Sequence, residues 1–240
     1  LYIFYTPTWN GLYLAFYLSS IFHKRLITLQ TEKVSSGKTG WSKRWTEKEE
    51  MRIAKKSVAI LTVTSQLQEY YNSLGVREKV WLITPIVADI NRFIPAQSQR
   101  SFNIGYLGTF NEKDGVKSII ESFELSKKKV NNLRLSLIGA TELKWDVESV
   151  EVVGQFRFDE LPNILNLCDC FIVNRTNEPF SSFGFPIKLA EYLATGSPVL
   201  LCDFPEYRKY LDETEVIYFK ADDTESLKEA ILWRYENYEK

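Results

Sequence analysis

The 240-residue sequence has very few of the residues that build covalent cross-links and metal centres: three cysteines and one histidine. Cys168, Cys170 and Cys202 are odd in number and irregularly spaced, which argues against a disulfide framework. A Cys-x-Cys pair with a single histidine does not have the spacing of a zinc site. We therefore expect three buried thiols in a reducing cytoplasm, and no bound metal.

The sequence also lacks a long apolar run and an excess of charge of either sign. No window holds 18 uninterrupted apolar residues, so no transmembrane helix is predicted. The net charge of −1 gives no general attraction to nucleic acid or to an anionic membrane, although a local basic patch remains compatible with it. The sequence starts without methionine or a basic leader on the apolar segment Leu1–Tyr5, so we expect a truncated N-terminal domain.

What the sequence does contain is a regular alternation of short apolar segments with helical patterns of about ten residues. Continuous apolar segments such as 58–63 and 170–173 predict buried parallel strands, and the alternation predicts βαβ units in an α/β fold. A polar stretch separates two such series. We predict a partial N-terminal doubly wound domain at 1–93, a linker at 94–101 and a C-terminal domain at 102–240.

Shorter patterns predict local structure in the first series. The apolar residues of 11–22 face nearly all round a helix, which predicts a buried helix. Residues 30–44 have no apolar period and are predicted to be a loop, and the Trp and basic residues at 41–45 leave contact with an acceptor sugar open. Two capping boxes, Thr46-x-x-Glu49 and Ser65-x-x-Gln68, predict the starts of two helices.

The stretch from Arg175 to Pro198 carries the clearest chemical pattern. A strand ends at Arg175, a loop of small residues follows, and a helix begins after Pro186. A helix N-terminus offers free backbone N–H groups and the positive end of a dipole, which suit a phosphate. Lys188 in the first turn opposes that dipole, so an anion between the two would explain it. Arg175 offers a planar fork for diphosphate oxygens.

Glu191 follows Lys188 by three residues, so both side chains project from one face of the helix. A carboxylate there can accept hydrogen bonds from the two vicinal hydroxyls of a ribose, while the lysine holds a phosphate. Two plainer interpretations stay open. Lys188 and Glu191 form an exposed ion pair worth roughly 0.2–0.5 kcal/mol, and Arg175 is a loop arginine in water.

The run from Gly184 to Val199 resembles the donor-site signature of the retaining GT-B glycosyltransferases called glycosyl transferases group 1, or glycosyltransferase family 4, in the branch with a Gly-Phe-Pro-x-Lys-x-x-Glu pattern. Ile104 to Thr109, followed by Gly115-Val116, is similar to the first strand and glycine loop of the family's C-terminal domain. The resemblance covers most of residues 45–230. It implies two facing Rossmann-like domains, the N-terminal one incomplete here.

The resemblance also implies an activity. The donor would be a sugar attached to a nucleoside diphosphate, UDP or GDP, with no metal or other cofactor, and transfer would retain the anomeric configuration. Arg175, Lys188 and the helix N-terminus would stabilise charge on the leaving diphosphate. The acceptor would be a glycan or a lipid-linked sugar, as in polysaccharide biosynthesis. We expect a cytoplasmic protein without a nucleic-acid partner, and leave open peripheral association with the inner face of the membrane.

The sequence departs from the family pattern in two places. Where many members carry an Arg and a Lys in the glycine loop, this sequence has Thr109 and Asp114, so Arg175 is the expected replacement and Lys113 a weaker candidate. Where many carry an acidic residue eight positions before the helix Glu, it has Phe183. The remaining residues expected at the donor are Gly108, Thr109, Phe156 beside the base, Ser182 and Gly184.

Two alternative functions remain within this architecture. A sugar-nucleotide epimerase or hydrolase would bind the same donor, and a non-catalytic domain would bind it without transfer. The sugar, the base and the oligomeric state are not predicted.

Overall fold

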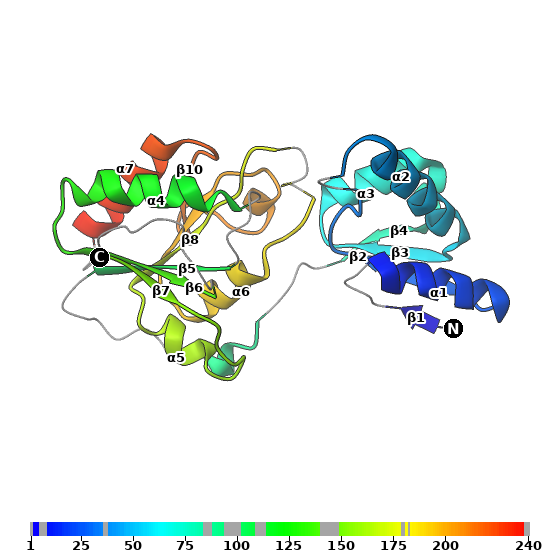
Figure 1. The fold of residues 1–240 in the computed structure, drawn as a ribbon, viewed down its shortest axis with the longest axis horizontal. Coiled ribbons are helices and arrows are strands. Elements are labelled where there is room, and N and C mark those ends of the chain that lie inside the picture. Colours follow the sequence, from blue (N-terminus) through cyan, green and yellow to red (C-terminus); the bar gives the residue numbers. More distant parts are fainter. Residues whose placement is uncertain are drawn as a thin grey trace. The chain divides into compact units, whose positions relative to one another are not determined.

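A computed structural model describes residues 2–4, 9–35, 38–83, 88–93, 102–108, 114–139, 149–178, 181 and 183–237. The chain is an α/β protein with two parallel sheets, as predicted, in two compact units (Figure 1). The first unit consists of Leu1–Ile86 with Ser182–Phe185, and the second of Val87–Ser181 with Pro186–Lys240. The predicted linker at 94–101 lies outside the described residues.

The first unit contains a four-stranded sheet with the order β1-β2-β3-β4. Each connection steps to the next strand in the same direction. Because such crossovers are right-handed, the three helices cover one face of the sheet. The strands are β1 (Tyr2–Phe4), β2 (Leu26–Gln30), β3 (Ala59–Thr62) and β4 (Val80–Leu82), and the helices are α1 (Trp9–Ile21), α2 (Gly40–Lys56) and α3 (Ser65–Tyr71).

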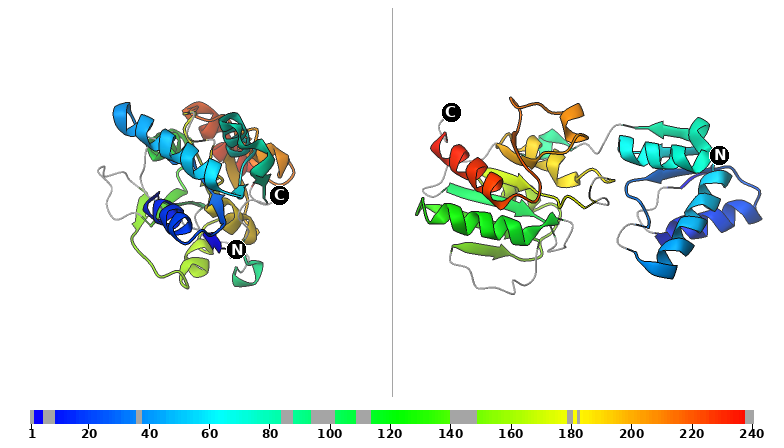
Figure 2. Two further views of the ribbon diagram at one scale, coloured as in Figure 1. Left: turned by 90° about the vertical axis from the view of Figure 1, so that its right-hand side faces the viewer. Right: turned by 90° about the horizontal axis from the view of Figure 1, so that it is seen from above.

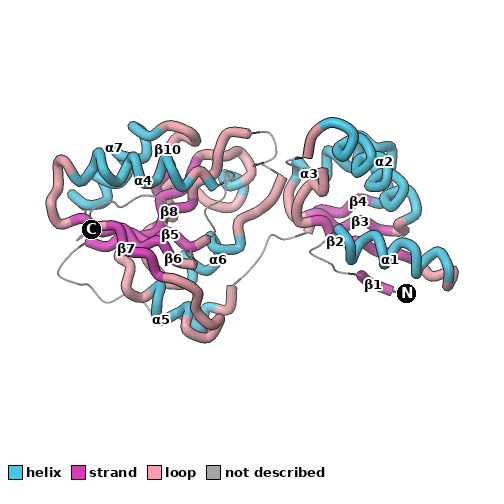
Figure 3. Tube along the Cα trace, viewed as in Figure 1, coloured by secondary structure: helices cyan, strands magenta, loops and turns pink. Residues whose placement is uncertain are grey.

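The second unit contains a six-stranded parallel sheet with the order β10-β9-β8-β5-β6-β7 (Figure 3). Strands β6 and β7 are added on one side of β5, and strands β8, β9 and β10 are added on its other side. The direction in which strands are added therefore reverses between β5 and β8, which are neighbours in the sheet. The strands are β5 (Phe102–Leu107), β6 (Leu133–Ile138), β7 (Val150–Val153), β8 (Cys170–Val173), β9 (Val199–Cys202) and β10 (Ile217–Phe219).

Helices cover both faces of this second sheet. Helices α4 (Val116–Lys127) and α7 (Thr224–Glu236) pack against each other on one face, and α5 (Leu161–Leu165) and α6 (Ile187–Ala194) lie on the other (Figure 1). Every residue of β8 and β9 is buried, which is why both strands are continuously apolar. Short helical turns complete the chain at Asn72–Val76, Arg77–Lys79, Ile90–Arg92 and Tyr207–Lys209.

Two helix starts in the first unit differ from prediction. Helix α2 begins at Gly40, so the predicted loop is wrong from there onward and Thr46 lies inside the helix, where its hydroxyl accepts a bond from Lys38. The predicted capping box is therefore wrong, since the N-cap is Thr39, and the Glu49 carboxylate pairs with Arg52 at 3.1 Å instead. Helix α3 is capped one residue earlier than predicted, by Thr64.

Helix α1 is not buried all round, which corrects the prediction from its composition. Leu12 and Phe16 pack in the core with Ile53, but Leu14 is 59% exposed and Ile21 is 66% exposed. Apolar character alone did not reveal this, because the helix packs toward the sheet and α2 on one side only. Among the described residues, no helix is long and apolar enough to cross a membrane.

The three cysteines are buried and free, as predicted. Burial raises the pKa of the Cys168 and Cys202 thiols to about 12, so both are neutral at physiological pH. Within the described part of the chain, no group of three or more metal-ligating side chains comes together.

Candidate functional site

The predicted residues of the second unit come from the C-terminal ends of β5 and β8 and from the helix that follows β8. Gly108 directly follows β5, Arg175 is the second residue after β8, and Lys188 lies in the first turn of α6. These strands are neighbours at the point where the strand order reverses. Open α/β sheets bind their ligands at such a switch point, outside the carboxyl ends of the strands.

Gly108 lies in close contact with the predicted lysine. Its φ is +151°, and its N–H donates to the Ile138 carbonyl at 2.9 Å, which continues the β5–β6 ladder past the end of β5. A Cβ at this position would lie 2.9 Å from the Tyr106 hydroxyl and 3.1 Å from Lys188 Nζ. A side chain here would have to displace the Tyr106 hydroxyl or the Lys188 amine, and the positive φ also favours glycine.

Gly139 forms a second glycine turn beside the first, at the end of β6. Its φ is +89°, and a Cβ there would lie 3.7 Å from both the Gly108 carbonyl and the Phe156 ring. The structure thus brings the predicted Gly108 and Phe156 to the same small region. The predictions did not include Gly139, although the glycine directly after a buried strand was a usable signal.

Lys188 is held in a buried network with Asp114 and Tyr106. Its Nζ lies 2.9 Å from Asp114 Oδ2, and the Tyr106 hydroxyl donates to the same oxygen at 2.9 Å. The Lys188 and Asp114 side chains are only 12% and 11% exposed. The interpretation of Lys188 as an exposed partner of Glu191 is therefore wrong. Burial lowers the pKa of Lys188, against the opposing effect of Asp114, and nearby Arg175 lowers it further.

Arg175 is buried at the end of β8, which excludes the interpretation as a loop arginine in water. The residue is 5% exposed, and its Nη1 donates to the Ser181 carbonyl at 2.6 Å. The neighbouring Asn174 amide donates to the Gly115 carbonyl at 3.2 Å and to Ser118 Oγ at 3.1 Å. These bonds tie the end of β8 to the start of α4. Arg175 and Lys188 are thus two largely buried cations near the switch point, and the Asp114 carboxylate pairs with Lys188.

Glu191 lies on α6, as predicted, but it does not pair with Lys188. The side chain is half-buried. Burial raises the pKa of Glu191, and the positive charge of Arg92 acts in the opposite direction. Arg92 in turn donates to the Phe158 carbonyl at 2.9 Å and lies over the Phe158 ring, 4.0 Å from its centre. The Glu191 carboxylate therefore lies within the electrostatic influence of Arg92, but the two side chains do not form a short ion pair.

The remaining predicted residues fall elsewhere. Thr109, Lys113 and Ser182 lie outside the described residues. Gly184 is buried in the first unit, where a Cβ would lie 3.2 Å from Glu32 Oε1.

Phe183 also belongs to the first unit. The Thr64 hydroxyl donates to its carbonyl at 2.9 Å, and its ring packs edge-on against Tyr70, with ring centres 6.0 Å apart. Lys33 Nζ lies 4.3 Å from the centre of the Tyr70 ring and 5.5 Å from that of Phe183. The aromatic residue that replaces the family's acidic residue is thus anchored among first-unit side chains.

Asp114 and Tyr106 are the site residues that sequence reasoning missed. Asp114 appeared only as a departure from the family pattern. A signal for it existed, because a lysine expected in a buried helix turn needs a counter-charge, and Asp114 is the acidic residue that precedes α4.

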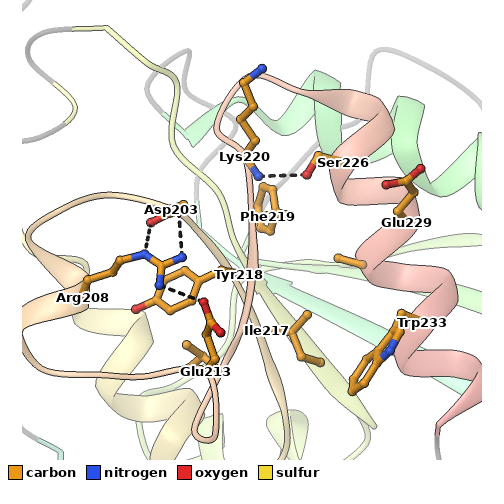
Figure 4. Close-up of a pocket in the computed structure, with 12 residues that line it drawn as sticks. Asp203, Arg208, Glu213, Ile217, Tyr218, Phe219, Lys220, Ser226, Glu229 and Trp233 are labelled. Atoms are coloured by element: carbon orange, nitrogen blue, oxygen red, sulfur yellow. Dashed lines mark hydrogen bonds and ion pairs between the residues drawn. The ribbon is translucent and has the colours of Figure 1, made fainter.

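A separate pocket of about 760 Å³ lies beside the edge strand β10 (Figure 4). No predicted site residue lines it. Its Arg208 donates to both oxygens of Asp203, at 2.6 and 2.9 Å, and to Glu213 at 3.1 Å. The guanidinium is therefore neutralised within the protein and is poorly suited to bind a phosphate.

Comparison with known families establishes the class of protein. Residues 101–237 match the family described as Glycosyl transferases group 1. The chain belongs to this family. It is a glycosyltransferase, and the resemblance drawn from the Gly184–Val199 run is confirmed. No curated sequence matches the chain significantly.

Solved structures of GT-B glycosyltransferases share the fold of this glycosyltransferase. HepE of Anabaena, solved with UDP and glucose, has a TM-score of 0.80 at 15% identity over 99% of this chain and 69% of its own. Sucrose-phosphate synthase of Thermosynechococcus elongatus has a TM-score of 0.77 at 16% identity, over 99% and 65%. The lipopolysaccharide outer core galactosyltransferase WaaB has a TM-score of 0.66 at 13% identity, over 98% and 66%.

Proposed function

We propose that this glycosyltransferase moves a sugar from a UDP- or GDP-sugar to a glycan or lipid-linked acceptor, with retention of configuration and without a metal ion. The observation that carries the proposal is the position of the Lys188 amine, which lies against Gly108 at the end of β5, at the switch point of the sheet. This is where the diphosphate of a nucleotide meets backbone N–H groups in doubly wound folds.

Arg175 and Lys188 would neutralise the diphosphate. Both cations are largely buried, and a charge in a partly desolvated place attracts an anion more strongly than it would in water. Charge builds on the diphosphate as the bond to the sugar breaks. Cations already fixed by Asp114 and by the Ser181 carbonyl need no reorganisation at that moment, and this is the main source of electrostatic catalysis.

The other residues would orient the nucleoside. Glu191 is a half-buried carboxylate three residues after Lys188 on the same helix, and it would accept hydrogen bonds from the ribose diol. Phe156, beside the Gly108–Gly139 pair, would border the base. HepE has been solved with UDP-glucose, which supports UDP as the first nucleotide to test.

The test is a thermal-shift screen of the chain with UDP, GDP and their hexoses, beside Lys188→Met and Glu191→Ala. We expect one nucleotide diphosphate to stabilise the chain, Lys188→Met to abolish the shift and Glu191→Ala to reduce it. Absence of a shift with every nucleotide, at concentrations up to the millimolar range, would contradict the proposal. Release of UDP without an acceptor, at the same rate as with one, would assign the chain to a hydrolase instead.

A further inference from the structure

The pocket beside β10 lies at an edge of the second sheet, and none of the residues assigned to the nucleotide donor lines it. Its lining comes from β10, from residues 203–213 after β9 and from α7. In Figure 4, β10 runs between two walls, with Arg208 and Glu213 on one side and Glu229 and Trp233 on the other. The volume of about 760 Å³ is within the range of roughly 300–1,000 Å³ that ligand pockets have.

The first wall is a polar cluster around Arg208. Its guanidinium donates to both oxygens of Asp203, at 2.6 and 2.9 Å, and to Glu213 at 3.1 Å. It also lies over the Tyr218 ring, 4.1 Å from its centre, and the Tyr218 hydroxyl donates to the Leu211 carbonyl at 3.1 Å. These contacts hold two carboxylates in place, and a carboxylate has further lone pairs that accept hydrogen bonds from a ligand. Groups that are already ordered reduce the entropic cost of binding.

The second wall is an exposed aromatic ring with a carboxylate beside it. Trp233 is 54% exposed and follows the exposed Glu229 by four residues, so both side chains project from one face of α7. The neighbouring Ala230 and Ile231 are buried, so other side chains hold the helix on the sheet. Removing the Trp233 ring therefore leaves the core packing of α7 in place.

Strand β10 adds backbone groups to the floor of the pocket. Among the described strands, it pairs with β9 alone. The Phe219 carbonyl accepts a bond from the Asp203 N–H at 2.7 Å, so it points toward β9. Successive residues of a strand direct their N–H and C=O groups to opposite sides, so those of Tyr218 point to the outer edge. One N–H and one C=O suit hydroxyl groups, but they are too few to hold an added peptide strand.

The charges of the lining exclude anionic ligands. Three acidic and two basic side chains line the pocket, which gives a formal net charge of −1. Arg208 pairs with Asp203 and Glu213. Lys220 pairs with Asp223 at 3.5 Å. Both cations of the described lining are thus neutralised within the protein, so a phosphate or an acidic sugar would meet net negative charge.

We propose that this pocket binds a neutral carbohydrate, through a pyranose unit of a glycan chain. A pyranose has an apolar face of C–H groups and a rim of hydroxyls. The apolar face would pack on the Trp233 ring, while hydroxyls would donate to the Glu213 and Glu229 carboxylates. Further hydroxyls would bond the outward backbone groups of Tyr218. A wholly apolar ligand would instead cover these polar groups without replacing their bonds to water.

A second glycan site would keep a long sugar chain attached to the enzyme between successive encounters with the donor site. Binding at one place raises the effective concentration of the rest of the chain at another. This consequence rests on the proposed glycan acceptor, whereas binding at β10 involves neither the nucleotide nor the residues that hold it.

The experiment is native electrophoresis of the chain in gels that contain dextran, galactomannan or mixed-linkage β-glucan, with alginate as the anionic polymer. We expect at least one neutral polysaccharide to retard the chain and alginate to leave its mobility unchanged. Trp233→Ala should raise the dissociation constant at least about tenfold, as removal of a central Trp does in other interfaces. Glu229→Ala should raise it roughly 2- to 10-fold, the value of one hydrogen bond. Trp233→Tyr keeps an aromatic platform and should retain most of the binding.

The matched control is Trp81→Ala, which removes a tryptophan that is 61% exposed on β4, an edge strand of the first sheet. This change should alter the dissociation constant by less than about twofold. Circular dichroism checks that each variant is folded. The gels contain no nucleotide, so their outcome is independent of the UDP thermal shift.

Four outcomes would overturn the proposal. They are the absence of retardation by every neutral polymer, stronger retardation by alginate, equal losses in Trp233→Ala and Trp81→Ala, and undiminished binding in both Trp233→Ala and Glu229→Ala. A dimer that Trp233→Ala dissociates would also overturn it, because the edge of β10 would then be covered by a second copy of the chain.

Discussion

Replacing Lys188 by methionine should destabilise the protein and abolish nucleotide binding, and the two effects can be separated. The lysine amine and the Asp114 carboxylate are 2.9 Å apart, and both side chains are nearly nine-tenths buried. Removing one partner of a buried pair costs about 3–5 kcal/mol, because the other charge is left unpaired. The Tyr106 hydroxyl still donates to Asp114, which places the expected loss near the lower value, about 3 kcal/mol.

Differential scanning calorimetry should show this loss as a fall in Tm of about 6–12 °C, since 1 kcal/mol corresponds to about 2–4 °C in chains of this size. The control is the double variant Lys188→Met/Asp114→Asn, which removes the orphaned charge and should recover more than half of the fall. Neither variant should bind UDP. The reasoning is refuted if the single variant keeps a Tm within about 2 °C of the parent, or if the double variant is no more stable than the single.

Three further predictions follow from other contacts. Glu191→Ala should weaken UDP binding about 10- to 100-fold, the value of hydrogen bonds to a charged group, while 2′-deoxy-UDP should bind parent and variant alike by calorimetric titration. Equal losses for both nucleotides would contradict the ribose role. Gly108→Ala should lower UDP affinity at least about tenfold, because its Cβ meets Tyr106 and Lys188, whereas Gly196→Ala, also at positive φ but in open space, should leave the titration unchanged. Tyr71→Phe removes a 2.7 Å bond to buried Glu50 and should cost about 1–3 kcal/mol at pH 8 in urea unfolding. Burial raises the pKa of Glu50, so the proton is bound more tightly in the folded state and this group's contribution to stability falls as pH rises from 4.5. The Tyr71→Phe loss should therefore shrink at pH 5, and a loss independent of pH would contradict this account.

The centre of the second sheet was predictable because β8 and β9 are buried along their whole length. Such strands are continuously apolar, and both have the predicted ends. Helix starts in the first unit were less predictable. Thr46 and Glu49 have the spacing of a capping box, but a salt bridge to Arg52 and a bond from Lys38 satisfy these side chains inside a longer helix.

The sequence predicted the site residues that lie close together along the chain, but it missed the partner that comes from a distant segment. Lys188 and Glu191 share one helix, so their spacing is visible in sequence. The partner of Lys188 is Asp114, 74 residues away, and the contact depends on the close approach that Gly108 allows. Residue spacing within a helix cannot reveal a counter-ion that another loop supplies. The exposed side of α1 was missed for a related reason, since hydrophobicity does not say what covers a residue.

The anchoring of Phe183 and Gly184 in the first unit has a consequence for how this enzyme can be divided. The chain passes between the two units three times, after residues 86, 181 and 185, although the fold has only two units. A recombinant fragment ending at Ile86 would leave the Tyr70 ring and the Thr64 hydroxyl without the segment that now packs on them. The complementary fragment would keep Lys188, Arg175 and Glu191 but would lose the support of the loop between them. Inhibitor screens run on an isolated second unit would therefore test this segment without the first-unit side chains that Phe183 and Gly184 contact.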